Sequence, residues 1–242
     1  MKKLLVIALA ILSLASCKKI TPEDRIAEIA RFFDGKEDTY STNLQQYDGE
    51  KKLDYLNLIL AKDLGAEDIW TIETDGQASL VAEFPGKEKN AALTMISASL
   101  DDPAACAAIL ELFEAYKDIK IQHKNTIRAL FYAPTDSTGN GGLHAVNEEL
   151  RASDELIIFD IELSTGRDLP RHTFVLEEKP VFAEQLISIV TPYLAPLGDY
   201  EFEQGVYPNR DWPLATSIYR YNFSDDFQQE VAAVTAFSFL LN

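Results

Sequence analysis

Asp101 and Asp102 are two adjacent residues whose type and position could support metal chemistry. Two residues separate them from residues 93–98, an apolar run typical of a buried strand, and Pro103 then opens an Ala- and Leu-rich run with helical spacing. In an open α/β sheet, binding sites gather at the carboxyl ends of the strands. The pair therefore supports two interpretations, a helix cap with a solvated neighbour or the remains of a metal site.

Two candidate nucleophiles, Ser137 and Cys106, have less support than the aspartate pair. Ser137, His144 and Asp136 lie close together in the sequence, but no Gly-x-Ser-x-Gly elbow precedes them, so a catalytic triad is disfavoured. Cys106 falls on the apolar side of its predicted helix, which favours a buried structural thiol over a nucleophile.

The elements that must position these side chains alternate along the chain. We expect helices at residues 21–34, 49–64, 103–116, 143–150, 181–194 and 227–241. We expect strands at residues 67–74, 77–84, 93–98, 125–133, 155–163, 171–176, 199–203 and 216–221, with a polar connection at 36–48. This order predicts an α/β fold, a three-layer αβα sandwich with a mixed, mostly parallel central sheet and an antiparallel hairpin at one edge.

Charge excludes some partners. The chain has 242 residues and a net charge of −17. A protein that neutralises nucleic-acid phosphates needs a basic surface, so we expect no nucleic acid partner. The same charge argues against binding an anionic membrane through surface charge.

The first residues predict a membrane anchor. Lys2 and Lys3 precede a short apolar segment, and Leu14-Ala15-Ser16-Cys17 has the pattern of a bacterial lipobox. We therefore expect a signal peptide at residues 1–16, a lipid on Cys17, a tether at 17–20 and one domain at 21–242. The residues after Cys17 favour an outer-membrane lipoprotein of the cell envelope. With Cys17 acylated, Cys106 has no disulfide partner within the chain.

The order of elements resembles the di-zinc exopeptidases, the group of zinc aminopeptidases and related carboxypeptidases and tripeptidases. Two N-terminal helices, a hairpin ending in Pro85-Gly86, a strand, an Asp-rich loop and an Ala/Leu-rich helix carry the resemblance, which spans residues 26–241. It implies a phosphorylase/hydrolase-like fold, in which two zinc ions activate a bridging water and a Glu acts as general base.

The ligand positions that this resemblance implies are degenerate. Where the family has His-x-Asp, this chain has Ser99-Leu100-Asp101, and Asp101 or Asp102 falls at the bridging position. Thr135-Asp136 replaces a Glu-Glu pair, so Asp136 is the candidate for the base. Asp160, with Glu162 as a weaker alternative, falls at a further ligand position.

The histidines weaken the metal site further. The three histidines, His123, His144 and His172, all fall outside the implied ligand positions. Zinc prefers nitrogen and sulfur ligands, and carboxylates alone favour a harder ion.

Three hypotheses follow. The first is a catalytically inactive relative with no cofactor, which binds a peptide or an envelope partner. The second is an active metal-dependent exopeptidase with zinc or another divalent metal on Asp101, Asp102, Asp136 and Asp160. The third is an unrelated α/β envelope protein whose resemblance is architectural.

A possible binding patch lies in the predicted loop 205–214. Tyr207, Arg210 and Trp212 combine aromatic surface with a cation, as recognition patches do, although Trp212 could serve packing alone.

Overall fold

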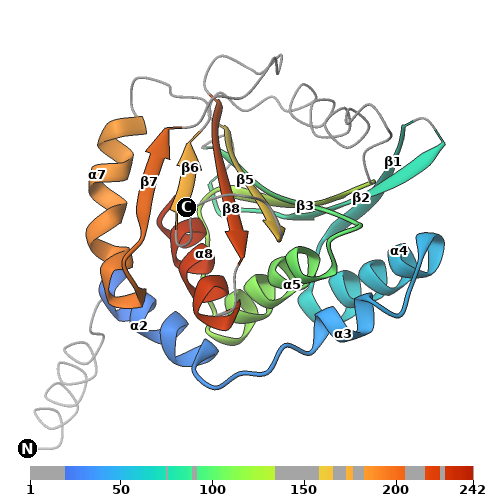
Figure 1. Cartoon of the computed structure of the whole chain (residues 1–242), viewed down its shortest axis with the longest axis horizontal. Helices are drawn as coiled ribbons and strands as arrows, with labels where there is room; N and C mark the ends of the chain where they lie inside the picture. Colours follow the sequence, from blue (N-terminus) through green and yellow to red (C-terminus); the bar gives the residue numbers. More distant parts are fainter. Residues whose placement is uncertain are drawn as a thin grey trace, which may run out of the picture.

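The computed structural model describes residues 20–74, 76–88, 92–133, 158–165, 173–176, 183–204, 216–223 and 227–241. Its strands are β1 (Asp68–Thr74), β2 (Gln77–Phe84), β3 (Leu93–Ser99), β4 (Thr126–Tyr132), β5 (Ile158–Thr165), β6 (Thr173–Leu176), β7 (Glu201–Gln204) and β8 (Thr216–Phe223). They form one sheet in the order β1-β2-β4-β3-β5-β8-β6-β7 (Figure 1).

The centre of this sheet is parallel and its β1–β2 edge is antiparallel. Strands β4, β3, β5 and β8 are parallel neighbours, and β6 and β7 are also parallel. The hairpin β1–β2 pairs with itself and with β4 in antiparallel fashion, and β6 is antiparallel to β8. The expected mixed sheet and edge hairpin are confirmed. The parallel centre matters for function because it brings the carboxyl ends of β3, β4 and β5 to one edge.

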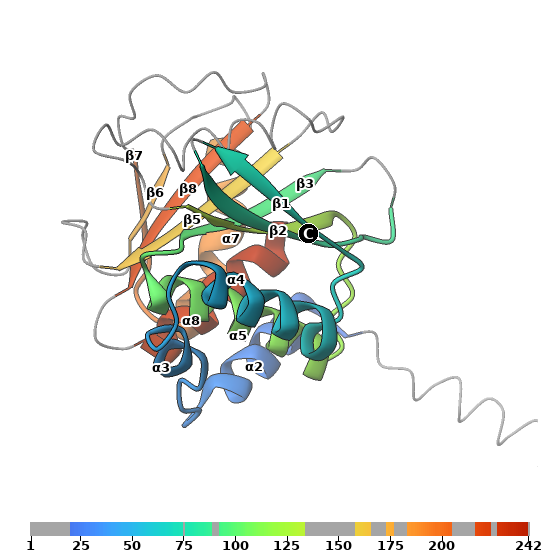
Figure 2. The same cartoon turned by 90° about the vertical axis from the view of Figure 1, so that its right-hand side faces the viewer.

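The described helices pack mainly against one face of the sheet. They are α2 (Pro22–Phe33), α3 (Tyr40–Leu44), α4 (Gly49–Leu58), α5 (Pro103–Asp118), α7 (Ala183–Leu194) and α8 (Phe227–Leu241), with a π-helical turn η1 (Ile59–Leu64) and a 3-10 turn η2 (Ala195–Leu197). Figure 2 shows α2, α4, α5 and α8 together on this face.

Both faces of the sheet are buried, as the expected three-layer α/β class requires. Ile96, Ala129 and Ile161 belong to the large core that includes α5 and α8. Neighbouring residues of the same strands, such as Met95 and Leu130, belong to a smaller buried cluster. Because side chains alternate along a strand, these two clusters lie on opposite faces.

Local chemistry explains the helix ends. Thr21 and Asp24 form a capping box at the start of α2, where Pro22 occupies the first turn, so this start was correctly predicted. Gly65 ends the second helical run with a φ of +77°, a left-handed conformation that glycine adopts without strain.

Two expectations need correction. Residues 36–48 are not only a connection, because Asp38 Oδ1 accepts hydrogen bonds from the amides of Tyr40 and Ser41 and starts the short helix α3. The predicted helix 49–64 changes to π-helical geometry at Ile59. Helix α7 ends at Leu194 as expected, with Pro192 inside its last turn. Among the described residues, no helix is long and apolar enough to span a membrane.

Candidate functional site

Asp102 connects the central helix to the neighbouring strand. Its Oδ1 accepts a hydrogen bond from the amide of Ala105 at 3.0 Å, which caps α5. The same carboxylate accepts from the Thr165 amide at 2.5 Å and from the Thr165 hydroxyl at 2.8 Å. A carboxylate that accepts bonds from a helix start and from the end of β5 is held in one orientation. These contacts match the cap interpretation of the sequence.

Asp101 has different surroundings although it is the next residue. It is exposed, and its backbone amide donates to Ser99 Oγ at 3.3 Å. It lines a pocket of about 410 Å³ between α4, the β1–β2 hairpin and the ends of β3 and β4. The lining residues include Asp48, Glu50, Lys52, Glu73, Gln77, Asp101 and Ala133. The solvated neighbour that the sequence suggested is therefore the residue that faces a pocket.

Lys52 supplies a buried positive charge at this edge. Its side chain lies among the buried polar groups, and Nζ donates to the Leu100 carbonyl oxygen at 2.8 Å. A buried ammonium needs such partners because it has lost its hydration. The sequence analysis missed Lys52 because a lysine next to Lys51 suggests a solvated side chain, although Lys52 precedes Leu56 by four residues and so shares the buried side of α4.

Asp160 is buried in the body of the sheet. It is 0% exposed, pairs in register with Met95 of β3, and accepts a hydrogen bond from Ser97 Oγ at 3.3 Å. Met95 precedes Ser99 by four residues, about 13 Å along an extended strand. Asp160 thus lies well below the edge where Asp101 and Asp102 are found. Glu162, also buried, accepts a hydrogen bond from the Tyr132 hydroxyl at 3.0 Å.

Cys106 is a buried thiol, as the sequence predicted. It is 0% exposed, and its Sγ lies 3.2 Å from the Ser99 carbonyl oxygen. Burial raises its pKa well above the usual range, and the charge of Asp102 adds to the effect. A thiol that stays protonated and inaccessible is a poor nucleophile.

Several candidates from the sequence lie outside the described residues. These are Cys17, Asp136, Ser137, His144, His172, Tyr207, Arg210 and Trp212. Of the histidines, only His123 is described, and its Nδ1 lies 2.8 Å from the Asn125 carbonyl oxygen, in the turn that precedes β4. It is thus at the amino end of a parallel strand, opposite the edge that carries Asp101.

The described acids do not fit a zinc pair. Asp102 is engaged by Ala105 and Thr165, and Asp160 lies about four strand residues from the edge. Within the described ranges, no group of three or more His, Cys, Asp or Glu side chains could hold a metal ion. Zinc also prefers nitrogen and sulfur donors, and the sulfur at the described part of this edge, that of Cys106, is buried and stays protonated.

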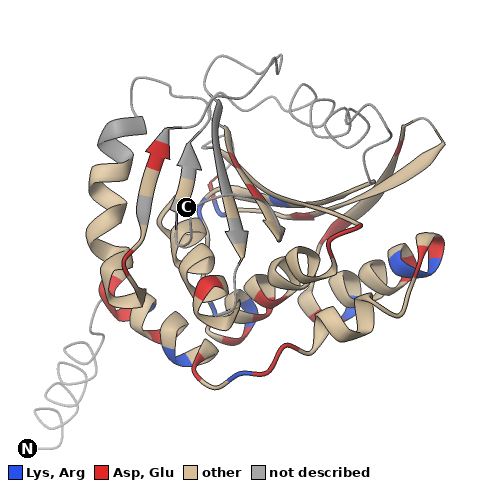
Figure 3. Ribbon diagram, in the orientation of Figure 1, with Lys and Arg blue, Asp and Glu red and all other residues tan. Residues whose placement is uncertain are grey.

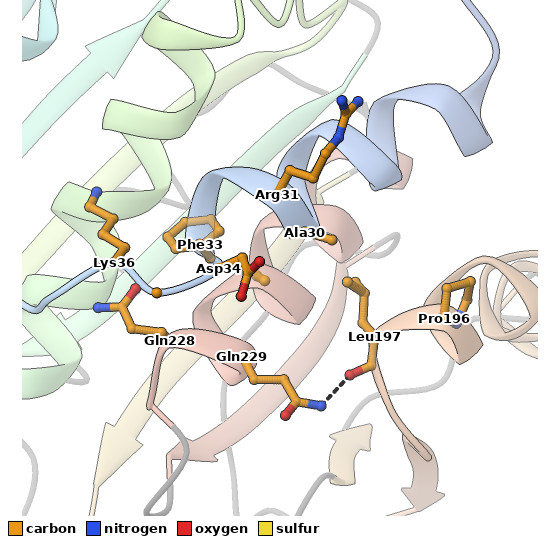
Figure 4. A pocket seen from close by; sticks show the side chains of 11 residues that line it. Ala30, Arg31, Phe33, Asp34, Lys36, Pro196, Leu197, Gln228 and Gln229 are labelled. Atoms are coloured by element: carbon orange, nitrogen blue, oxygen red, sulfur yellow. Dashed lines mark hydrogen bonds between the residues drawn. The ribbon is translucent and has the colours of Figure 1, made fainter.

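A larger cavity of about 580 Å³ lies away from this edge, between the end of α2, η2 and the start of α8 (Figure 4). Arg31, Asp34 and Lys36 contribute its charged groups, and Gln229 Nε2 donates to the Leu197 carbonyl oxygen at 2.5 Å. Lys36 is already paired with Glu114 at 2.7 Å. The cavity thus carries charges of both signs, and one of them is already engaged in an ion pair. These charges do not favour one kind of ligand.

The fold defined by this sheet and these helices is that of the zinc exopeptidases. No protein-family model and no curated protein sequence matches the chain. Solved structures do match, and the resemblance inferred from the sequence is confirmed at the level of the fold.

Three solved structures illustrate the similarity, and each matches along nearly its whole length. A leucine aminopeptidase precursor from Bacteroides thetaiotaomicron has a TM-score of 0.57 at 13% identity, covering 92% of this chain and 97% of its own. A proposed Zn-dependent exopeptidase from Bacteroides vulgatus has a TM-score of 0.56 at 16% identity, covering 92% and 95%. A glutaminyl cyclase from Tannerella forsythia has a TM-score of 0.56 at 15% identity, covering 92% and 99%. At such identities the fold is shared, and the activity does not follow from it.

Proposed function

We propose that this protein is a lipid-anchored protein of the cell envelope whose exopeptidase-like domain binds a peptide or a partner protein and does not hydrolyse peptides. The observation that carries the proposal is the engagement of Asp102 by Ala105 and Thr165. In the family that the sequence resembles, a carboxylate near this position bridges two metal ions. Here its oxygens stabilise a helix start and a strand end.

The pocket beside Asp101 is the place where we expect a ligand. Four carboxylates, those of Asp48, Glu50, Glu73 and Asp101, line it together with one ammonium group, that of Lys52. With four carboxylates against one ammonium group, the pocket keeps an excess of negative charge. A ligand with a positive group, such as the amino terminus or a basic side chain of a peptide, complements it.

Metal content tests the proposal directly. A soluble form beginning at Ile20 is incubated with zinc, manganese or calcium, and bound metal is measured by plasma mass spectrometry. We expect no metal above background. Near-stoichiometric metal that is lost on Asp101→Asn, Asp136→Asn or Asp160→Asn would overturn the proposal and support the alternative, an active metal-dependent exopeptidase with a carboxylate site.

That alternative has one observation in its favour, the similarity of the fold to a proposed Zn-dependent exopeptidase and to a leucine aminopeptidase precursor along nearly the whole length of those chains. An exopeptidase screen on aminoacyl and dipeptide substrates separates the two functions. Release of amino acids that a chelator abolishes and zinc restores would establish the enzyme. Calorimetric binding of a basic peptide without turnover would support the binding module.

Anchoring through Cys17 is tested separately. We expect the wild-type protein to fractionate with membranes and to carry an acylated N-terminal peptide by mass spectrometry. Cys17→Ser is expected to release the protein from the membrane fraction. An unmodified N-terminal peptide in the wild type would refute the lipid anchor and leave the binding proposal for the domain intact.

A further inference from the structure

Exposed large hydrophobic side chains are rare on the described surface. Only Ile20, at 51% exposure, Leu58, at 45%, and Ile189, at 60%, qualify among the described residues. Scattered single residues of this kind are ordinary, but neighbouring ones indicate a contact surface.

Ile189 belongs to an apolar surface that α2 and α7 share. Pro192 and Tyr193 follow Ile189 by three and four residues and therefore lie on the same side of α7. Pro192 and Tyr193 line a small groove of about 130 Å³ together with Ile26 and Ala27 of α2. The α2–α7 face is defined here as Ile20, Ala27, Ile189, Pro192 and Tyr193.

This face carries very little charge in a strongly charged protein. The chain has 61 Lys, Arg, Asp and Glu residues, yet residues 187–197 contain none. The described turns of α7 are accordingly drawn without charged residues in Figure 3, whereas α4 at the other end carries both signs. Glu23, at the rim of the groove, is the charged residue that lines it.

The position of the lipid anchor indicates what covers the face. Cys17 precedes Ile20 by three residues, so the anchored residue lies within about 11 Å of Ile20 even if the chain is fully extended. Ile20 directly precedes Thr21, the cap of α2, and the first turns of α2 form one wall of the groove. A lipid on Cys17 would therefore bring the α2–α7 face to the bilayer surface.

We propose that the α2–α7 face rests on the lipid bilayer, so that the anchored domain has a second, apolar contact with the membrane. This inference rests on the proposed lipid anchor at Cys17. Tyr193 suits the position, because aromatic side chains with a polar tip favour the interface between lipid and water. The uncharged residues 187–197 also avoid the cost of desolvating ionised groups near the membrane.

The proposed contact fixes the orientation of the domain relative to the membrane. Figure 1 shows α7 and the start of α2 at one end of the long axis and α4 at the other. The pocket beside Asp101 is lined by α4 and the β1–β2 hairpin, so it lies toward the end remote from the α2–α7 face. A domain resting on α7 thus presents this pocket away from the lipid, to soluble ligands or partners.

The test compares Ile189 with Leu58 as a matched control. Both are exposed large hydrophobic residues, and Leu58 is the last residue of α4, a helix that Figure 1 shows apart from α7. Ile189→Cys and Leu58→Cys are made in the mature lipidated protein, labelled with a small fluorophore and inserted into phosphatidylcholine vesicles. Buried Cys106 stays unlabelled in the native protein.

Two quenchers show whether each label contacts lipid or water. Lipids with brominated acyl chains are expected to lower the fluorescence at position 189 at least about twofold and to leave position 58 unchanged. Aqueous iodide is expected to show the reverse order. Each labelled variant is also made with Cys17→Ser. Without the lipid anchor, we expect brominated lipid to quench neither label.

The outcomes separate the proposals. Equal quenching of the two labels by brominated lipid, in protein that floats with the vesicles, would overturn the α2–α7 contact and leave the anchor intact. Protection of position 189 from iodide without lipid quenching would assign the face to a second copy of the chain and also overturn the contact. Wild-type protein that fails to float would refute the anchor and the contact together.

Discussion

Replacing Asp102 by alanine tests the central observation on the candidate site. The change removes the cap of α5, for which alanine costs about 0.5–2 kcal/mol. It also removes the bonds from the Thr165 amide and hydroxyl, and hydrogen bonds to a charged group contribute about 1.5–3 kcal/mol. Since the three bonds share one carboxylate and do not add fully, we expect a loss of about 2–4 kcal/mol.

Urea unfolding at 25 °C, followed by circular dichroism, measures this loss. For an m-value of about 3 kcal/mol/M, a loss of 3 kcal/mol lowers the midpoint by about 1 M. Asp102→Asn keeps an acceptor that caps helices about as well as Asp, so it should lose much less stability. Asp101→Ala is the position-matched control, and it should change stability little because Asp101 is exposed.

The pattern of the three variants decides between structure and metal binding. If Asp102 is a structural residue, the loss in Asp102→Ala is the same with a chelator and with added zinc. A metal bound to the native state would stabilise the wild type by mass action, and Asp102→Asn would abolish that gain. Equal stabilities of Asp102→Ala and Asp101→Ala, or a loss that appears only when zinc is present, would refute the reasoning.

Three further predictions concern buried polar groups. Lys52→Met should lower the free energy of unfolding in urea by about 1.5–3 kcal/mol, because it leaves the Leu100 carbonyl oxygen without its charged donor. Lys51→Met, at an exposed position, should be nearly neutral. Equal effects of the two variants would contradict the role assigned to Lys52. Burial raises the pKa of Glu111 from 4.5 to about 7, so between these pH values the native state holds a proton that the unfolded state has lost. The free energy of unfolding therefore falls as the pH rises through this range, by about 3 kcal/mol in total. Glu111→Gln should flatten this fall, and an unchanged slope would count against the role of Glu111. In the Cys17→Ser protein, a thiol reagent should leave Cys106 unmodified until denaturant is added, and rapid native labelling would show that the thiol is accessible.

Much of the fold could be predicted from local patterns. The hydrophobic run of β3, Pro103 at the start of α5 and the capping box of α2 each point to one local structure, and the structure has them where expected. The start of α3 was missed because it depends on one Asp side chain in a polar segment without apolar periodicity. The π-helical end of the second helical run was missed because its residues have ordinary helical spacing.

The candidate site could be predicted only in part. The sequence identified Asp101 and Asp102 and offered the cap as one interpretation, because Asp before Pro-Ala-Ala is a common helix start. It could not show that Thr165, 63 residues away, donates to the same carboxylate. It also could not place Asp160 below the edge of the sheet, since that depends on the register between β3 and β5.

The sequence by itself determined the α/β class, the order of the elements and the absence of histidines at the implied ligand positions. These depend on residue types and on short-range periodicity. The tertiary structure alone decided which carboxylate is engaged, which one faces a pocket, and that α2 and α7 share an apolar face. Such features depend on the packing of segments distant in sequence, and a hydrogen bond or a groove exists only when packing brings both sides within a few ångströms.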